Sequence, residues 1–99
     1  MEIKPGRTYR AKKPREVWIG FSERVANDRT VLWANGIHVQ YDGPAVKPGR
    51  RYPTVTVEVF RAWASYDCTD ELPEGEYAPW PLTQEAKDRL RRQAEELRS

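Results

Sequence analysis

The chain has 99 residues, which is enough for one domain and too few for two. Charged residues make up 32% of it and hydrophobic residues 38%, and an aromatic content of 11% excludes a disordered chain. The net charge is only +2, but residues 1–52 carry +6, residues 53–83 carry −5 and the remainder carries +1. A basic first half of this kind can attract an anionic partner.

The sequence shows neither a secretory signal nor a membrane span. Its first residues lack an apolar segment, and the longest apolar run, Val17 to Phe21, is far too short to cross a bilayer. The single cysteine, Cys68, has no second cysteine with which to form an internal disulfide. The sequence therefore predicts a cytoplasmic protein that makes no contact with a membrane.

The first strand is predicted over residues 7–13, where polar and apolar side chains alternate. Tyr9 and Ala11 should face the interior of the domain. Arg10 and Lys12 alternate with them and should face solvent, because successive side chains of a strand point to opposite faces.

A second strand and a hairpin follow. Residues 17–21 predict the strand, and the polar residues 22–28 predict a loop. The clearest local signal is Asn35-Gly36, which stands between two β-prone runs within residues 29–42 and predicts a hairpin.

The register of this hairpin decides where Trp33 lies. In a two-residue turn, Trp33 falls on the face opposite Val39. In a three-residue loop over residues 34–36, with the glycine as a bulge, both side chains face the core. Burying the tryptophan favours the second register by roughly 1–3 kcal/mol, so Trp33 is predicted to be a core residue. In both registers His38 and Gln40 lie on the other face.

The middle of the chain admits two interpretations. Residues 51–55 predict a strand, and residues 54–59 alternate as if the strand continued. The apolar residues that follow also line one helical face, with Thr56 as a possible N-cap. We expect a short strand that runs into a helical turn near residues 56–64.

A C-terminal helix is predicted near residues 84–97, with Thr83 as its N-cap. The acidic connector that precedes it, residues 67–76, should be a solvated loop. The helix carries a narrow apolar stripe, which consists of Leu82, Ala86, Leu90, Ala94 and Leu97. Because so short a helix is marginal by itself, the stripe should dock on the domain or, in a possible homodimer, on a second copy.

Together these elements predict a mainly β (α+β) fold, either a small barrel or a strongly bent antiparallel sheet of about four or five strands. The β domain should span residues 1–82, including the acidic connector, with residues 83–99 as the C-terminal amphipathic helix. The order of strand, hairpin, strand and helical turn over residues 6–13, 33–41 and 52–63 resembles the SH3-like small barrels. In its compact character the chain also resembles accessory proteins of bacteriophages and mobile elements.

No residue pattern predicts catalysis, a cofactor or a metal site. His38 is the only histidine and is expected on a strand face among polar residues. Cys68 stands close to Asp67 and Asp70, and neighbouring carboxylates raise the pKa of a thiol, which is the opposite of what a nucleophile needs. One Cys and one His cannot supply a zinc site of the usual kind. The sequence therefore predicts a non-enzymatic protein without a cofactor.

A binding face is predicted from the basic first half of the chain. Its candidate residues are Arg7, Arg10, Lys12, Lys13, Arg15, His38, Gln40, Arg50 and Arg51. The favoured function is that of a protein-interaction module, because the chain has more aromatic residues than a small core can hide, and exposed aromatics anchor interfaces. The alternative is a nucleic-acid-binding barrel, in which Lys and Arg contact phosphates and an aromatic ring stacks on a base. A small enzyme without a recognisable motif is the third possibility.

Overall fold

The structure of the protein, a computed structural model, describes residues 1–72 and 77–98, with only the backbone described at 97 and 98. Its strands are β1 (Thr8–Ala11), β2 (Glu16–Ile19), β3 (Glu23–Ala26), β4 (Arg29–Ala34), β5 (His38–Asp42), β6 (Thr54–Thr56) and β7 (Ala64–Asp67). Its helices are α1 (Val57–Trp63), the short 3-10 helix η1 (Thr69–Glu71) and α2 (Gln84–Arg98). Within the described ranges no helix combines the length and the apolar character needed to cross a bilayer.

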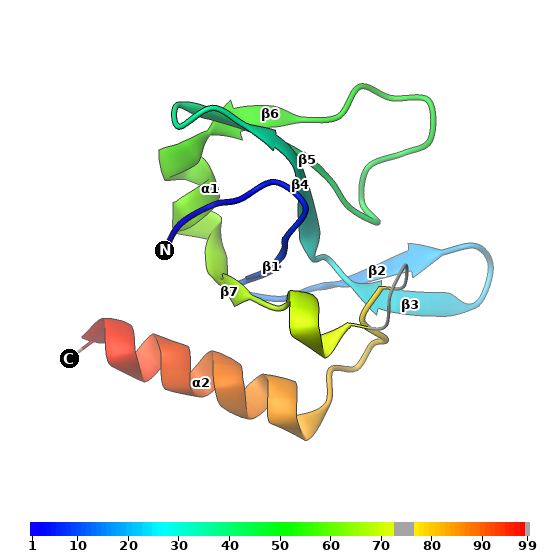
Figure 1. Cartoon of the computed structure of the whole chain (residues 1–99). Helices are drawn as coiled ribbons and strands as arrows, with labels where there is room; N and C mark the ends of the chain where they lie inside the picture. Colours follow the sequence, from blue (N-terminus) through cyan, green and yellow to red (C-terminus); the bar gives the residue numbers. More distant parts are fainter. Residues whose placement is uncertain (73–76, 99) are drawn as a thin grey trace.

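Five of the strands form one antiparallel sheet in the order β6-β5-β4-β1-β7, and β2 and β3 form a separate two-stranded sheet (Figure 1). The predicted mainly β fold with an antiparallel sheet is therefore confirmed. Over the described residues, the edge strands β6 and β7 do not pair with each other, so the sheet does not close into a barrel. The SH3-like barrel is not confirmed.

Helix α1 covers one face of the main sheet, and the main hydrophobic core lies between the two. Its N-cap is Thr56, whose hydroxyl accepts a hydrogen bond from the Val59 amide at 3.2 Å, as predicted. Phe60 packs edge-on against Tyr9, with ring centres 5.6 Å apart. Around these two rings lie the other buried core residues, Ile3, Val31, Val39, Tyr41, Val57 and Ala64. Residues 54–63 are thus a short strand followed by a helix, as expected.

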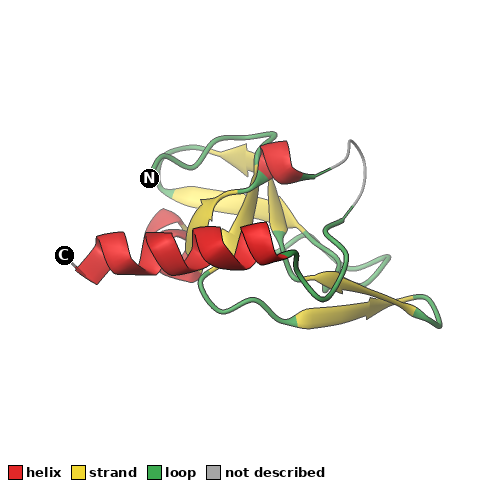
Figure 2. Ribbon diagram, turned by 90° about the horizontal axis from the view of Figure 1, so that it is seen from below, coloured by secondary structure: helices red, strands yellow, loops and turns green. Residues whose placement is uncertain are grey.

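Helix α2 lies against the other face, beside β7 (Figure 2). The hydroxyl of Thr83 accepts a hydrogen bond from the Ala86 amide at 3.2 Å, which confirms the predicted N-cap. Leu82 and Ala86 are buried in a second apolar cluster with Ala78. The first half of the stripe therefore docks on its own domain. The homodimer stays a prediction, and the side chain of Leu97 lies outside the described residues.

The outer face of β1 is not exposed to solvent. Tyr9 is buried beneath α1 as expected, but Arg10 is also buried, with only 1% of its surface exposed. The predicted alternation of the strand is present, and Lys12 is exposed. The prediction that Arg10 faces solvent is wrong because η1 and α2 cover the face to which the alternation assigns it.

The predicted hairpin is formed by β4 and β5, with a different turn. The amide of Asn35 donates to the carbonyl of His38 at 3.2 Å, so Gly36 and Ile37 are the two central residues of the turn. Gly36 has a φ of 87°, a conformation that favours glycine. Neither register considered for the sequence is the observed one.

The bulge of this hairpin lies at Leu32, which is the extra residue between two cross-strand pairs. Val31 pairs with Tyr41, and Trp33 pairs with Gln40. Trp33 is 47% exposed, so the prediction that it lies in the core is wrong. The bulge turns both Leu32 and Trp33 outward, and Phe60 from α1 fills the core instead.

The predicted loop over residues 22–28 is instead largely strand β3. It pairs with β2 in an antiparallel arm that projects beyond the main sheet (Figures 1 and 2). Residues 77–80 run along this arm, and the amide of Ala26 donates to the carbonyl of Ala78 at 2.9 Å. The strand was missed because its first residues are polar and exposed, while only Val25 and Ala26 are buried.

The predicted acidic connector, residues 67–76, is only partly a solvated loop. Asp67 ends β7, a strand that was not predicted, and η1 follows it. Glu71 of η1 accepts a hydrogen bond from Arg10 at 3.0 Å and so belongs to the packed domain. Residues 73–76 lie outside the described residues.

Candidate functional site

Two adjoining recesses lie at the start of β4, the first beside the loop that joins β5 to β6 and the second between the β1–β2 connection and the end of α1. One has a volume of about 430 Å³ and the other about 400 Å³. Asn27 and Arg29 line both, so the two recesses meet at these residues. We call the pair of recesses the basic groove.

Arg29, at the centre of the basic groove, is held by two aromatic rings. Its guanidinium carbon lies 4.4 Å from the ring centre of Tyr41 and 4.1 Å from that of Trp63. No carboxylate of the described residues lies within ion-pair distance of it. Burial lowers the pKa of Arg29, although Tyr41 opposes the shift. This half-buried cation therefore has no counterion among the described residues. A bound anion could supply one.

Six further basic residues line the basic groove: Lys12, Lys13, Arg15, Lys47, Arg50 and Arg51. All six are exposed, and none pairs with a described carboxylate. Among the described residues, the one acid that lines the groove is Asp28, which is neutralised by Arg10 at 3.1 Å. The groove therefore concentrates uncompensated positive charge.

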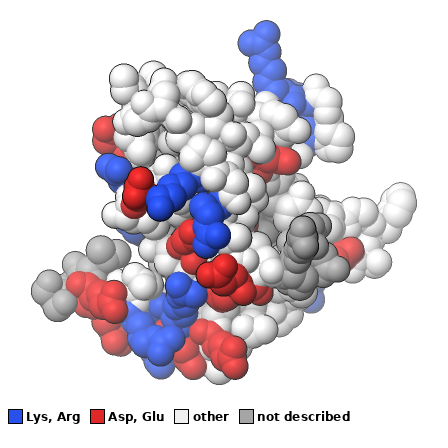
Figure 3. All heavy atoms as spheres, in the orientation of Figure 1, with Lys and Arg blue, Asp and Glu red and all other residues white. Residues whose placement is uncertain are grey.

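Outside the basic groove, basic and acidic side chains lie close to one another on the surface of α2. Figure 3 shows acidic and basic side chains interspersed at the lower left, over α2. On α2, for example, Arg91 lies 3.4 Å from Asp88. At the top of the same view a basic side chain projects into solvent from the loop between β5 and β6 (Figure 3).

The structure brings together most of the predicted binding face. The predicted residues that line the basic groove are Lys12, Lys13, Arg15, Arg50 and Arg51. His38 and Gln40 do not join them. Tyr41 lines the groove, and these two residues alternate with Val39 and Tyr41, so they lie on the opposite face of β5.

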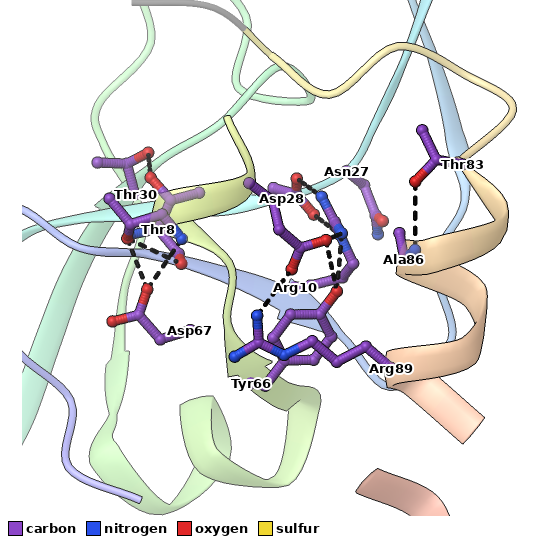
Figure 4. Close-up of polar contacts among 12 residues, drawn as sticks. Thr8, Arg10, Asn27, Asp28, Thr30, Tyr66, Asp67, Thr83, Ala86 and Arg89 are labelled. Carbon is purple, nitrogen blue, oxygen red and sulfur yellow. Dashed lines mark hydrogen bonds and ion pairs between the residues drawn. The ribbon is translucent and has the colours of Figure 1, made fainter. Parts of the chain in front are cut away.

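Arg10 belongs to a buried ionic cluster rather than to a binding face (Figure 4). Its Nε and Nη2 donate to the two carboxylate oxygens of Asp28 at 3.2 and 3.1 Å. Its Nη1 donates to the Tyr66 hydroxyl at 2.8 Å and to Glu71 at 3.0 Å. Arg89 of α2 closes the cluster, 3.3 Å from Glu71 and 4.3 Å from the ring centre of Tyr66.

The pKa shifts and hydrogen bonds of this cluster indicate a structural role. Burial alone would lower the pKa of Arg10, but the hydrogen bonds and charge of Asp28 outweigh it and raise the pKa. Burial, together with Glu71, raises the pKa of Tyr66 to about 12. No buried side-chain polar atom of the described residues lacks a hydrogen-bond partner. The cluster therefore ties β1, β7, η1 and α2 together.

Arg7 is also committed within the domain. Its Nε donates to Asp67 at 2.7 Å, and its Nη2 lies 3.7 Å from Asp70. Burial alone would raise the pKa of Asp67, but the hydrogen bonds from Arg7 and Thr69 lower it. With Arg10, Arg7 accounts for the two predicted basic residues that do not line the groove.

The two side chains that the sequence analysis considered for catalysis, Cys68 and His38, differ in exposure. Cys68 is fully buried, and burial raises the pKa of its thiol, with Asp28 adding to the shift. His38 is exposed at the start of β5. Over the described ranges, no group of His, Cys, Asp and Glu side chains is placed to hold a metal ion.

Arg29 and Lys47 are the basic residues of the groove that were not predicted, and Arg29 is the central one. A signal for it was present, because Arg29 is two residues from Val31 and thus falls on the core-facing side of the predicted hairpin strand. An arginine in such a position has to end beside a carboxylate, on an aromatic ring or at an opening to solvent. Nothing local indicates that Tyr41 and Trp63 would meet there.

Comparisons of the chain with protein-family models, with curated proteins and with solved structures found no match.

Proposed function

We propose that this protein is a nucleic-acid-binding module without enzymatic activity, and that it binds the phosphate backbone in the basic groove. The observation that carries the proposal is Arg29, a half-buried cation on two aromatic rings with no described carboxylate as a partner. The sequence alone favoured a protein partner. The proposal departs from it because the basic residues gather in one groove.

A polyanion suits the basic groove better than a small anion does. Its seven basic residues are spread over two recesses that meet only at Asn27 and Arg29. A single phosphate would neutralise one part of this surface and leave the rest uncompensated. A nucleic acid carries a phosphate at every nucleotide, so several could be paired in succession, with release of counterions.

The proposal is tested by fluorescence anisotropy with a labelled DNA or RNA of mixed sequence. Affinity should fall steeply between about 50 mM and 200 mM salt, because each phosphate contact releases counterions. Arg29→Ala should weaken binding by about tenfold or more. The double variant Lys13→Ala/Arg51→Ala changes exposed side chains only and should weaken binding without affecting folding.

The matched control is Arg92→Ala, which removes an exposed arginine of α2 outside the groove. It should leave the affinity unchanged. The absence of binding at about 50 mM salt, where such contacts are strongest, would refute the proposal. Equal losses in Arg92→Ala and in the groove variants would also refute it, since the effect would then be one of net charge alone.

A second candidate function, contact with a protein, is favoured by the β4–β5 hairpin. Leu32, Trp33 and Ile37 of this hairpin are 43%, 47% and 64% exposed. Exposed apolar and aromatic side chains are typical anchors of interfaces. This function predicts that a partner protein co-purifies with the native chain and is lost from Trp33→Ser but kept by Lys13→Ala/Arg51→Ala. A role as an accessory protein of a bacteriophage or mobile element is compatible with either function and stays a prediction.

A further inference from the structure

A third recess adjoins the basic groove and lies toward the β2–β3 arm. It has a volume of about 490 Å³ and lies between the arm and the loop that joins β5 to β6. Lys47 and Arg50 line both this recess and the neighbouring part of the groove. These two cations therefore stand at the boundary of the groove and the recess, where they can contact the phosphates of a ligand that reaches both.

Three aromatic side chains line this third recess, which we call the aromatic cleft. They are Trp18 of β2, Tyr52 of the loop before β6, and Tyr77. Their exposed fractions are 58%, 48% and 41%. Exposing rings of this size is unfavourable in water, and three of them around one cleft form a surface on which planar, apolar groups can stack.

The ring of Trp18 has one charged neighbour on the arm. The guanidinium carbon of Arg24 lies 5.6 Å from the ring centre, and Arg24 is held by Glu16 at 3.0 Å. Among the described residues, Asp42 is the one acid that lines the aromatic cleft, and its carboxylate accepts a hydrogen bond from the Gly43 amide at 2.7 Å. The cleft thus places exposed aromatic rings beside cations.

We propose that the aromatic cleft stacks unpaired bases, so that the preferred ligand is a single strand whose backbone lies in the basic groove. This inference rests on the proposed nucleic-acid binding. Lys and Arg contact the phosphates of single strands and duplexes alike. Bases in a duplex are stacked on one another and cannot offer their faces to Trp18, Tyr52 or Tyr77. The cleft therefore adds affinity only for unpaired bases.

The test compares two labelled DNA probes of the same mixed sequence, a single strand of about 16 nucleotides and its duplex. Anisotropy titrations at about 50 mM salt should show tighter binding of the single strand. Trp18→Ala and Tyr52→Ala should each weaken single-strand binding by about 5- to 100-fold and leave duplex binding unchanged. Trp18→Phe keeps an aromatic ring and should retain most of the affinity.

Trp33→Ala is the matched control, because Trp33 is similarly exposed but does not line the cleft. Equal affinity for the two probes, or equal effects of Trp18→Ala and Trp33→Ala, would overturn the inference and leave the proposed function standing. If neither probe binds, or if Lys13→Ala/Arg51→Ala does not weaken the binding of either, the proposed function fails and the inference fails with it.

Discussion

Arg10 and Asp28 form an ion pair through two parallel hydrogen bonds, of 3.2 and 3.1 Å, inside the domain. Only 1% of Arg10 and 3% of Asp28 are exposed. Charges so deeply buried need compensating hydrogen bonds, and the guanidinium donates two more, to Tyr66 and Glu71. The pair joins β1 to the segment before β4 and places both beneath η1 and α2.

Removal of one partner of this pair should be strongly destabilising. Asp28→Ala leaves the Arg10 charge without its main counterion and should lower the free energy of unfolding by about 3–5 kcal/mol. Urea unfolding followed by circular dichroism measures the change. The control is Arg24→Ala, which breaks the exposed pair with Glu16 and should cost at most about 1 kcal/mol. Similar losses for the two variants would contradict a structural role for the buried cluster.

The thiol of Cys68 should be inert in the folded protein. It has no exposed surface, and burial raises its pKa, so little thiolate is present and none is accessible. Iodoacetamide should label it only as fast as the domain unfolds, and rapidly in urea. Ser22→Cys adds a thiol at the exposed tip of the arm and should be labelled at once under native conditions. Equally fast labelling of Cys68 would show that the surrounding cluster opens readily.

Alkaline pH should destabilise the protein through the same residue. The pKa of Cys68 is raised in the folded state, so between the unfolded value of about 8.5 and the folded value only the unfolded chain loses the proton. The free energy of unfolding should therefore fall as the pH rises above about 8.5. Urea unfolding at a series of pH values measures the slope, and Cys68→Ala should make it shallower. An unchanged slope in this variant would assign the loss to other groups.

Acid should weaken the contact between β1 and β7. The pKa of Asp67 is lowered in the folded state. The ionised carboxylate therefore contributes fully to the free energy of unfolding above the unfolded pKa of about 3.9, and this contribution is lost as the pH falls through the lower, folded pKa. Asp67→Asn should flatten this part of the stability curve, measured by thermal unfolding between neutral and acidic pH. Asp70→Asn, whose side chain is 90% exposed and 3.7 Å from Arg7, should keep the native slope.

Gly43 should not tolerate a side chain. A Cβ atom at this position would lie 2.8 Å from the backbone carbonyl oxygen of Asp28, a contact that only a shift of the backbone can relieve. Gly43→Ala should lower the free energy of unfolding by about 1–3 kcal/mol. Ala45→Ser, an exposed change in the same loop, should alter it by less than about 0.5 kcal/mol. Urea unfolding distinguishes the two, and a neutral Gly43→Ala would show that this loop moves freely.

The elements predicted from the sequence are those with local signals. Thr56 and Thr83 cap their helices as predicted, because an N-cap depends on residues within one turn. The Asn35-Gly36 hairpin formed for the same reason, although its turn and its bulge lie elsewhere than predicted. Strand β3 was missed, since its exposed side resembles a polar loop and only the contact with residues 77–80 buries the rest.

What the sequence by itself determined is the two capped helices, the existence of the hairpin at Asn35-Gly36 and the basic character of the first half of the chain. Only the tertiary structure decided which of those charged side chains are accessible to a ligand. Alternation along a strand separates two faces but cannot say what covers each one, so Arg10 became buried and Trp33 exposed. Likewise, Arg29 became the centre of the groove only because the sheet order and α1 bring Tyr41 and Trp63 to it. Such contacts join residues far apart in sequence, and their energies depend on packing that no local pattern records.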